Sequence, residues 1–315
     1  MMEKLRTIFM GTPEFAVLCA EKLTEISEVV AVVTQPDQRA GRGQKLVASP
    51  VKKFAEEKGI PVYQPVKVKA DDFVPVLEEL KPDLIVVVAF GQILSQRILD
   101  IPKYGCINVH ASLLPRYRGA APMQWCIING EKETGVTTMF MNAGLDTGDM
   151  LQKTVVEITP DMNLETLHDT LSVKGAELLV STVQALTDGT LERTVQDDAL
   201  SNYAPMITKE TGRIDWRKSS QEIHDLVRGL DSWPGAYATL DGKTFKIWRT
   251  RCVSSEVKAA PGEVVNLTKK GFMIGTGDGA LEILELQAPG KKRMSAANYV
   301  CGHALEEHTQ FDILE

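Results

Sequence analysis

The stretch Leu84-Ile-Val-Val-Val-Ala-Phe90 is apolar at every position. It is too short to cross a membrane, which takes about 20 residues, and its β-branched content favours a strand. Because neither face of such a strand is polar, we expect it in the middle of a parallel sheet with helices on both sides. The stretch therefore predicts an α/β domain.

Short apolar runs on either side of this strand alternate with helical patterns, which is typical of βαβ units. We expect further strands at 5–10, 29–33, 106–109, 134–141 and 151–158, and helices from about Thr12 and over 163–186. This order predicts a doubly wound, mainly parallel, Rossmann-like sheet in a domain that covers residues 1–189.

The sequence pattern changes in the second part of the chain. Residues 190–208 show neither a helical nor a strand period, so we predict a linker. In the domain expected at 209–315, Ser219 and Glu222 form a capping-box pattern that predicts a helix. The runs 237–240, 244–249, 262–265, 271–274 and 281–286 then alternate with Gly and Asp-Gly turns. They predict a small β-barrel, of the OB type.

Composition limits the class of protein. The 315 residues carry 35 basic and 42 acidic side chains, a net charge of −7, which argues against general coating of nucleic acid and against DNA as a partner. Residues 209–270, however, hold twelve Lys or Arg and eight Asp or Glu, which suits a local contact with a polyanion.

The cysteines and the apolar runs indicate the compartment. Five scattered cysteines without a C-x-x-C pair predict reduced thiols and no zinc site. Gly11 and Pro13 interrupt any signal-peptide core, and no apolar run is long enough for a membrane span. We expect a cytoplasmic protein with no membrane partner.

The candidate catalytic residues cluster around Asn108-Val-His110. Alternation along a strand directs both side chains to one face, at the carboxyl end where doubly wound sheets bind their ligands. Asp146 follows in a Gly-rich turn between two expected strands. A carboxamide, an imidazole and a carboxylate suit acyl transfer without a covalent enzyme intermediate. Each residue alone has a structural explanation too, and only the combination points to catalysis.

These motifs resemble folate-dependent formyltransferases. The resemblance rests on 108–122 and 143–149, and it implies Asn108, His110 and Asp146 as the catalytic residues. Four further features resemble the branch of the family that acts on methionyl-tRNA. They are Phe9-Met-Gly11-Thr-Pro-Glu-Phe15, Gln35-Pro-Asp37 with Gly41-Arg42-Gly43, Ala89-Phe-Gly91-Gln-Ile-Leu-Ser95, and the C-terminal domain.

The resemblance implies a reaction and its co-substrate. A neutral amine attacks the formyl carbon of 10-formyltetrahydrofolate, Asn108 and His110 stabilise the oxyanion, and Asp146 holds His110 and relays protons. No metal takes part. The implied folate-binding residues are Phe90, Gly91, Ile93, Leu94, Ser112, Leu113, Leu114 and Pro115. Residues 90–94 are equally well explained as a buried strand that enters a helix.

The resemblance also implies initiator methionyl-tRNA as the acceptor and a monomeric enzyme. Basic residues in the loop 35–53 and in the strand 243–249 could contact the tRNA. They are Arg39, Arg42, Lys45, Lys243, Lys246 and Arg249. An ordinary solvated loop and core packing of Phe245 and Trp248 remain as alternatives.

Three other functions fit parts of the sequence. A formyltransferase for a purine-pathway amine or a sugar nucleotide would share Asn108, His110 and Asp146. A cysteine enzyme could use Cys106, which falls on the same strand face as Asn108 and His110. A folate- or RNA-binding protein without catalysis is the third, and the presence of all three candidate residues argues against it.

Overall fold

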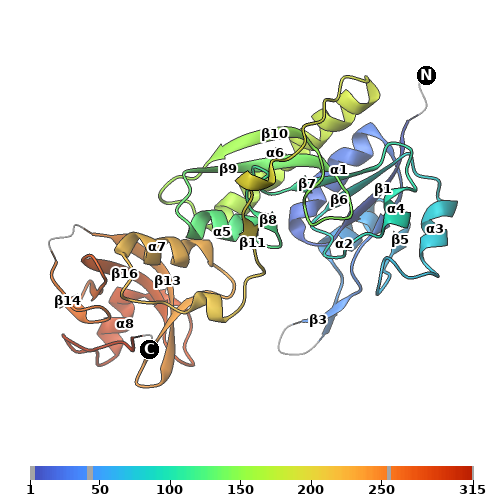
Figure 1. The fold of residues 1–315 in the computed structure, drawn as a ribbon. Coiled ribbons are helices and arrows are strands. Elements are labelled where there is room, and N and C mark those ends of the chain that lie inside the picture. Colours follow the sequence, from blue (N-terminus) through green and yellow to red (C-terminus); the bar gives the residue numbers. More distant parts are fainter. Residues whose placement is uncertain (1–3, 41–44, 254–256, 314–315) are drawn as a thin grey trace. The chain divides into compact units, whose positions relative to one another are not determined.

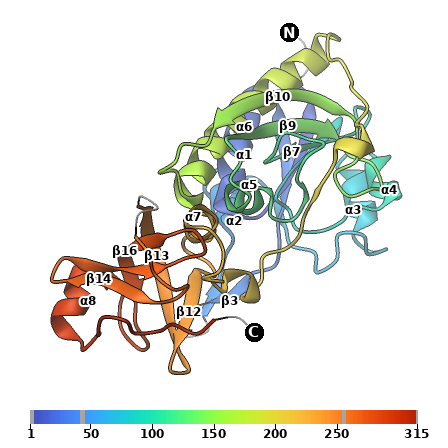
Figure 2. The same ribbon diagram turned by 60° about the vertical axis from the view of Figure 1, so that its left-hand side comes forward.

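The computed structural model describes residues 4–40, 45–253 and 257–313. The chain divides into two structural units (Figures 1 and 2). The first comprises Met1–Gly119, Glu133–Glu157 and His168–Ala204, and the second comprises Ala120–Lys132, Ile158–Leu167 and Pro205–Glu315. The segment predicted as a linker, 190–208, is therefore divided after Ala204, and most of it belongs to the first unit.

The first unit is built on a seven-stranded sheet in the order β10-β9-β7-β6-β1-β2-β5. Its strands are β1 (Arg6–Gly11), β2 (Glu28–Val33), β5 (Val62–Tyr63), β6 (Leu84–Val88), β7 (Cys106–His110), β9 (Glu133–Phe140) and β10 (Met150–Glu157). β5, β2, β1, β6 and β7 are parallel, whereas β9 runs antiparallel to both of its neighbours, β7 and the edge strand β10 (β9 and β10 are green in Figure 1). The predicted mainly parallel α/β sheet is confirmed.

Helices cover both faces of this sheet because its central strands have no polar face. All five residues of β6 are buried. The helical elements are η1 (Glu14–Ala16), α1 (Val17–Ile26), α2 (Pro50–Glu57), α3 (Val74–Glu79), α4 (Gln96–Leu99), α6 (Leu164–Thr187) and η2 (Asp198–Leu200). Ile85, Val87 and Cys106 share a core cluster with residues of α3 and α4. α6 lies on the other face, where Gly175 packs close to Val109.

The predicted loop 35–53 contains regular structure. β3 (Gln38–Ala40) and β4 (Lys45–Val47) pair as an antiparallel two-stranded sheet. α2 then begins at Pro50, and the Ser49 side chain accepts a hydrogen bond from the Lys52 backbone N–H, as an N-cap does. The segment expected to be a loop therefore contains, in its described residues, a pair of strands and the start of a capped helix.

The order in which the chain adds strands reverses between β1 and β6, and this switch point determines where a ligand can bind. β2 lies on one side of β1 and β6 on the other, so the crevice opens outside the carboxyl ends of β1 and β6. Hydrogen bonds from Thr12 Oγ1 and Gln35 Nε2, both 3.1 Å, converge on the Phe90 carbonyl there. β7 is the next strand along, so its carboxyl end borders the same crevice.

The second unit is an antiparallel sheet in the order β12-β13-β16-β15-β14 with β17 paired to β16. Its elements are α5 (Pro122–Ile128), η3 (Glu210–Gly212), α7 (Ser220–Gly229), β12 (Ala236–Leu240), β13 (Lys243–Cys252), β14 (Val264–Thr268), β15 (Gly271–Gly275), β16 (Ala280–Gln287), β17 (Met294–Ser295) and α8 (Ala296–Gly302). The predicted capping box of Ser219 and Glu222 is present at the start of α7. The predicted second domain of short strands is confirmed, and its strands are antiparallel.

The C-terminal segment joins the two edge strands of this sheet. Backbone hydrogen bonds connect Val264 on β14 with His308 and Thr309, each 2.8 Å. The Asp312 N–H then donates to the Thr239 carbonyl on β12 at 2.9 Å. The strands therefore enclose a core around the fully buried Trp216.

Candidate active site

Asn108 and His110 lie on β7, and the structure places them on the same face, as predicted. Cys106 packs against α3 and α4, and alternation directs Asn108 and His110 to that side. His110 is 6% exposed and Asn108 is half-buried. In the described part of the chain, the Asn108 side chain makes no hydrogen bond, so its amide can donate to a substrate.

The imidazole of His110 is held by a main-chain group. Its Nε2 lies 2.9 Å from the carbonyl oxygen of Tyr117. A carbonyl can only accept, so Nε2 carries the proton of this hydrogen bond. The opposite nitrogen, Nδ1, faces Asp146 Oδ2 at 3.7 Å, which is longer than a hydrogen bond. Asp146 was expected to hold His110, but in this structure the Tyr117 carbonyl orients the ring.

Asp146 reaches His110 because its loop folds back along β7. β9 runs antiparallel to β7, so Phe140, the last residue of β9, pairs with Ile107. Ile107 lies three residues before His110, about 10 Å along the strand. The loop 141–149 must return over that distance to place Asp146 beside His110. The Gly119 N–H then fixes the carboxylate by donating to Asp146 Oδ2 at 2.8 Å.

Two residues beside the site adopt the left-handed backbone region. Tyr117 has φ 59° and Asp146 has φ 53°. This region is unfavourable for residues other than glycine, although aspartate tolerates it better than most. Such conformations persist where the surrounding structure holds them. The holding contacts come from residues 196–204, which sequence reasoning did not connect with the site.

These contacts join two loops of the first unit to one segment. Gln196 Nε2 donates to the carbonyls of Asp146 at 2.8 Å and Gly148 at 2.7 Å. Asn202 Oδ1 accepts from the Tyr117 N–H at 2.6 Å. β11 (Tyr203–Ala204) pairs in parallel with β8 (Arg118–Gly119). No local sequence signal marks these residues, because their partners lie 48–85 positions away.

Cys106 cannot serve as the nucleophile of a cysteine enzyme. Burial, together with a smaller contribution from the charge of Asp100, raises the pKa of its thiol to about 12. Thiolate is the nucleophilic form, so a thiol with this pKa is unreactive at neutral pH. Cys106 instead packs in the core between β6, β7, α3 and α4.

The predicted folate-binding residues fall into two groups by burial. Phe90, Leu94, Ser112 and Leu114 are at most 4% exposed, and Phe90 and Leu94 belong to the core cluster under α3 and α4. Ile93 is 73% exposed, Gly91 is exposed, and Leu113 and Pro115 are half-buried. The core explanation thus holds for the side chains of Phe90 and Leu94, whereas their main chain borders the crevice.

The segment 112–115 is anchored by β9 and β10. Thr137 Oγ1 donates to the Ser112 carbonyl at 2.7 Å and accepts from the Leu114 N–H at 3.1 Å. The ammonium group of Lys153 donates to the Leu114 carbonyl, and partial burial lowers the pKa of Lys153. The wall of the site next to His110 is therefore fixed by three hydrogen bonds.

Basic residues expected to contact tRNA occur in both units. In the first unit, Arg39 on β3 and Lys45 on β4 are exposed, and Arg42 lies outside the described residues. Lys52, at the end of the same segment, is paired with Asp37 at 2.8 Å, and this contact lowers the pKa of Asp37. The described part of the hairpin therefore presents Arg39 and Lys45 on its surface.

In the second unit, the three basic residues of β13 differ in their surroundings. Lys243 is exposed. Lys246 donates to the Pro234 carbonyl at 2.7 Å and lies over the ring of Trp248. Arg249 pairs with Glu285 at 3.4 Å. Phe245 is buried in the core, so Lys246 and Trp248 occupy the other face of the strand, as alternation requires.

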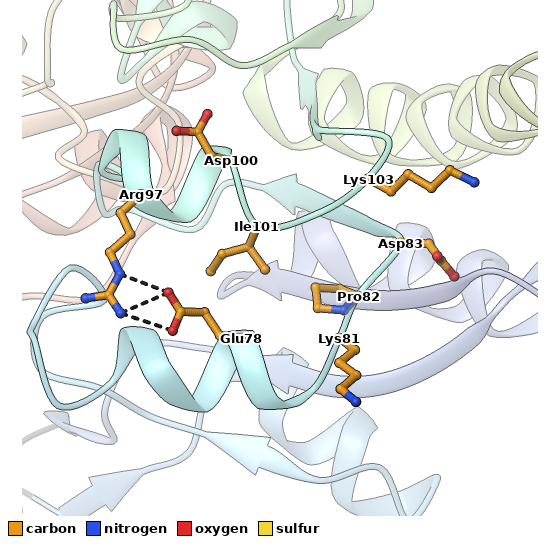
Figure 3. Close-up of a pocket in the computed structure, with 8 residues that line it drawn as sticks. All are labelled: Glu78, Lys81, Pro82, Asp83, Arg97, Asp100, Ile101 and Lys103. Carbon is orange, nitrogen blue, oxygen red and sulfur yellow. Dashed lines mark hydrogen bonds and ion pairs between the residues drawn. The ribbon is translucent and has the colours of Figure 1, made fainter.

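A surface pocket lies at the amino ends of the strands of the first unit's sheet, away from the carboxyl ends that carry the candidate site. Figure 3 shows its charged lining, in which Arg97 and Glu78 form an ion pair of 2.9 Å. Asp83 and Lys103, which also line it, come just before β6 and β7. Ligands of doubly wound sheets bind at the carboxyl ends of strands. This pocket lies at the amino ends and contains none of the predicted site residues.

The described residues lack the features of two other classes of site. No group of three or more His, Cys, Asp or Glu side chains in this part of the chain is arranged to hold a metal ion. Among the same residues, none of the helices combines the length and the apolar character that a membrane span requires.

The comparisons with known proteins concern nearly the whole chain. Residues 5–183 match the family model described as formyl transferase, and residues 206–304 match the formyl transferase C-terminal domain. The methionyl-tRNA formyltransferase of Geobacter metallireducens is 57% identical over 97% of this chain and 98% of its own. That of Geobacter sulfurreducens is 54% identical over 98% of this chain and 97% of its own.

Solved structures show the same fold at lower identity. An N-formyltransferase from Helicobacter canadensis, solved with folinic acid and dTDP-3-aminofucose, has a TM-score of 0.66 and 21% identity, covering 93% of this chain and 100% of its own. HypX from Aquifex aeolicus, in complex with tetrahydrofolic acid, has a TM-score of 0.63 and 21% identity over 94% of this chain and 47% of its own. With these matches and the arrangement of Asn108, His110 and Asp146, the chain belongs to the formyltransferase family, in the group of the methionyl-tRNA formyltransferases.

Proposed function

We propose that this protein transfers the formyl group of 10-formyltetrahydrofolate to the α-amino group of initiator methionyl-tRNA. The observation that carries the proposal is the facing pair of His110 Nδ1 and Asp146 Oδ2, with Asn108 on the same strand face, in a chain 57% identical to a methionyl-tRNA formyltransferase. These three residues are the proposed catalytic groups. A carboxamide, an imidazole and a carboxylate supply an oxyanion donor and a proton relay without a covalent intermediate.

The gap between His110 and Asp146 suits an amine. Two hydrogen-bond legs of about 2.8 Å close a triangle over the 3.7 Å between the two atoms, so one nitrogen can contact both. An α-amino group has a pKa of about 7.7–8.0, so part of it is already neutral near pH 7. The pair therefore needs only to orient the amine and to accept one proton.

Formyl transfer requires one bond to form, one bond to break and one proton to move. The amine nitrogen bonds to the formyl carbon, and an oxyanion forms, to which the amide of Asn108 donates. The imidazole of His110 stabilises it as well once its Nδ1 has taken the proton of the amine, because its Nε2–H is bonded to the Tyr117 carbonyl. The proton that the amine loses passes to the His110–Asp146 pair. The bond from the formyl carbon to the folate nitrogen breaks, and that nitrogen receives the proton. No residue of the chain is consumed, and the formyl group ends on the amine.

The folate co-substrate occupies the crevice beside the same strand ends. Its pterin lies against the main chain of 90–94, the exposed Ile93 and the half-buried Leu113 and Pro115. Ser112 and Leu114 act through their backbone, which Thr137 and Lys153 hold in place. The buried side chains of Phe90 and Leu94 support this wall from the core.

Transfer RNA binds through basic residues of both units. Arg39 and Lys45 present charge on the β3–β4 hairpin, together with Arg42 outside the described residues. Lys243, Lys246 and Arg249 supply further basic groups along β13. Lysine and arginine side chains bind phosphates of any sequence, so this contact supplies affinity rather than recognition of methionine.

The two parts of the chain have different functions in this proposal. The first unit, which includes 190–204, carries catalysis, and 209–315 carries a share of the tRNA contacts. The enzyme acts as a monomer in the cytoplasm, where initiator tRNA is charged and used. Size-exclusion chromatography with light scattering tests the monomer, and a dimer mass contradicts it.

The test of function is formyl transfer from 10-formyltetrahydrofolate to methionyl-tRNA. Uncharged tRNA and free methionine serve as controls, because the first lacks the amine and the second lacks the polyanion. Product on the charged tRNA alone supports the proposal. Transfer to a sugar nucleotide or to a purine-pathway amine, with none to methionyl-tRNA, contradicts it.

A further inference from the structure

Gln196 stands out among the buried polar side chains outside the catalytic trio. It is 8% exposed, although it lies in a segment whose neighbours are mostly exposed. Its amide nitrogen donates to the carbonyls of Asp146 (2.8 Å) and Gly148 (2.7 Å). Its amide oxygen accepts from Arg118 Nε at 3.0 Å. Both donors and the acceptor are therefore satisfied, and the two donated hydrogen bonds go to the loop that carries Asp146, with a longer contact of 4.0 Å from Nε2 to Met139 Sδ.

The loop 141–149 depends on these contacts because of where it starts. It leaves β9 beside Ile107 and must return to His110, and Asp146 holds a φ of 53° within it. Inside the first unit, Gln196 connects the returning part of the loop to Arg118, whose neighbour Gly119 donates to Asp146 Oδ2. One side chain thus joins the Asp146 backbone to the strand that orients its carboxylate.

Asn202 holds the other partner of the pair. Its Oδ1 accepts from the Tyr117 N–H at 2.6 Å, and its carbonyl accepts from the Arg118 N–H at 3.0 Å. Tyr117, with φ 59°, supplies the carbonyl that orients His110. The segment 196–204 therefore fixes both sides of the gap between His110 Nδ1 and Asp146 Oδ2.

We propose that Gln196 is a positioning residue for formyl transfer, with Asn202 as its counterpart on the His110 side. Gln196 touches no reacting atom; it sets the distance and orientation of Asp146 relative to His110. This role rests on the proposed formyl transfer reaction. A displacement of about 1 Å in a reacting geometry can lower the rate by about a hundredfold, so the effect is expected in kcat rather than in KM.

The first variant is Gln196→Met, which keeps the side-chain volume and removes all three hydrogen bonds. We expect kcat to fall about 10- to 100-fold while KM for 10-formyltetrahydrofolate stays within about twofold of the parent. Val195→Thr is the matched control, because Val195 is the adjacent residue and is 78% exposed. Its kcat should equal that of the parent. Asn202→Ala, at an exposed position, provides a second variant if Gln196→Met does not fold.

A double-mutant cycle separates positioning from general stability. If Gln196 acts through Asp146, then Gln196→Met should change kcat little, about twofold or less, once Asp146→Asn is present. A side chain with a merely structural role would lower kcat by the same factor in both backgrounds. Equal factors in the two backgrounds overturn the proposal.

Hydrogen exchange at the Gly119 amide gives a readout that needs no substrate. This N–H donates to Asp146 Oδ2, so displacement of Asp146 should speed its exchange about tenfold in Gln196→Met and leave it unchanged in Val195→Thr. Unchanged exchange overturns the positioning role, as does normal kcat in a variant with fast exchange. If the parent does not formylate methionyl-tRNA, the proposed function fails, and the exchange experiment still decides whether Gln196 holds Asp146.

Discussion

Thr137→Val removes a single hydroxyl that holds the main chain next to His110. Thr137 is fully buried, and its Oγ1 donates to the Ser112 carbonyl and accepts from the Leu114 N–H. Valine has the same shape, so the substitution leaves no cavity. What it leaves is two buried backbone groups without a partner, because Ser112 and Leu114 are also shielded from water.

The size of the effect follows from these two groups. Each unsatisfied buried group costs about 1–3 kcal/mol, so the pair costs about 2–6 kcal/mol. The added methyl group offsets about 1 kcal/mol. We therefore expect the free energy of unfolding to fall by about 3 kcal/mol, which corresponds to a decrease in Tm of about 6–12 °C for a unit of this size. The KM for 10-formyltetrahydrofolate should rise, because 112–115 forms a wall of the proposed folate site.

Scanning calorimetry measures the unfolding midpoint, and Thr154→Val is the control. Thr154 lies on β10 opposite Val136, and within the described residues its hydroxyl makes no hydrogen bond. The control makes the same chemical change without stranding a backbone group, so its midpoint should match the parent. Equal midpoints for Thr137→Val and Thr154→Val would refute the assignment of the hydroxyl as an anchor of 112–115.

Three further predictions concern catalysis, tRNA and pH. His110→Ala should lower kcat about 10²- to 10⁴-fold and leave the Kd for folate, measured by calorimetry, nearly unchanged; near-normal turnover would remove His110 from the mechanism. Lys45→Ala should raise KM for methionyl-tRNA and lower the salt dependence of tRNA binding by about one phosphate contact. Lys174→Ala on α6 is the control and should change neither quantity. Identical salt dependences for the two variants would exclude Lys45 from the tRNA interface. Burial raises the pKa of Cys19 and Cys106 from 9.0 to about 12, so above pH 9 the unfolded chain releases thiol protons that the folded chain keeps. Stability should therefore fall by about 1.4 kcal/mol per thiol for each pH unit between 9 and 12, and replacing both cysteines by alanine should flatten that slope in urea titrations; parallel slopes would contradict the prediction.

Local physical signals account for the parts of the fold that the sequence predicts well. β6 is predictable because five consecutive apolar residues need burial on both faces. α7 is predictable because Ser219 and Glu222 satisfy each other's backbone N–H at its start. The helix expected at 163–186 is observed at Leu164–Thr187, followed by Gly189 in the left-handed region that often ends a helix.

The β3–β4 hairpin lacks such a signal. Its described residues are mostly basic or exposed, and Leu46 is 66% exposed. Strand prediction depends on alternation between a buried and an exposed face, and a hairpin without a buried face has no alternation to detect. Its pairing is set by backbone hydrogen bonds, which the side-chain pattern does not report.

The site is predictable in its residue types and less so in its geometry. The Asn108 and His110 arrangement follows from the period of a strand. The placement of Asp146 depends on an antiparallel strand that carries the chain away from His110 and a loop that brings it back, and neither is visible in local spacing. Gln196 is still harder to identify, because its function comes entirely from partners distant in sequence.

The closure of the second unit's sheet by residues 308–312 has a consequence for biosynthesis. β12 and β14 are synthesised long before these residues, so the outer edges of both strands lack partners while more than forty further residues are added after Val264. Exposed strand edges are the places where nascent chains associate wrongly. Until Asp312 has emerged, the outer edges of β12 and β14 are therefore the part of this unit most open to wrong association.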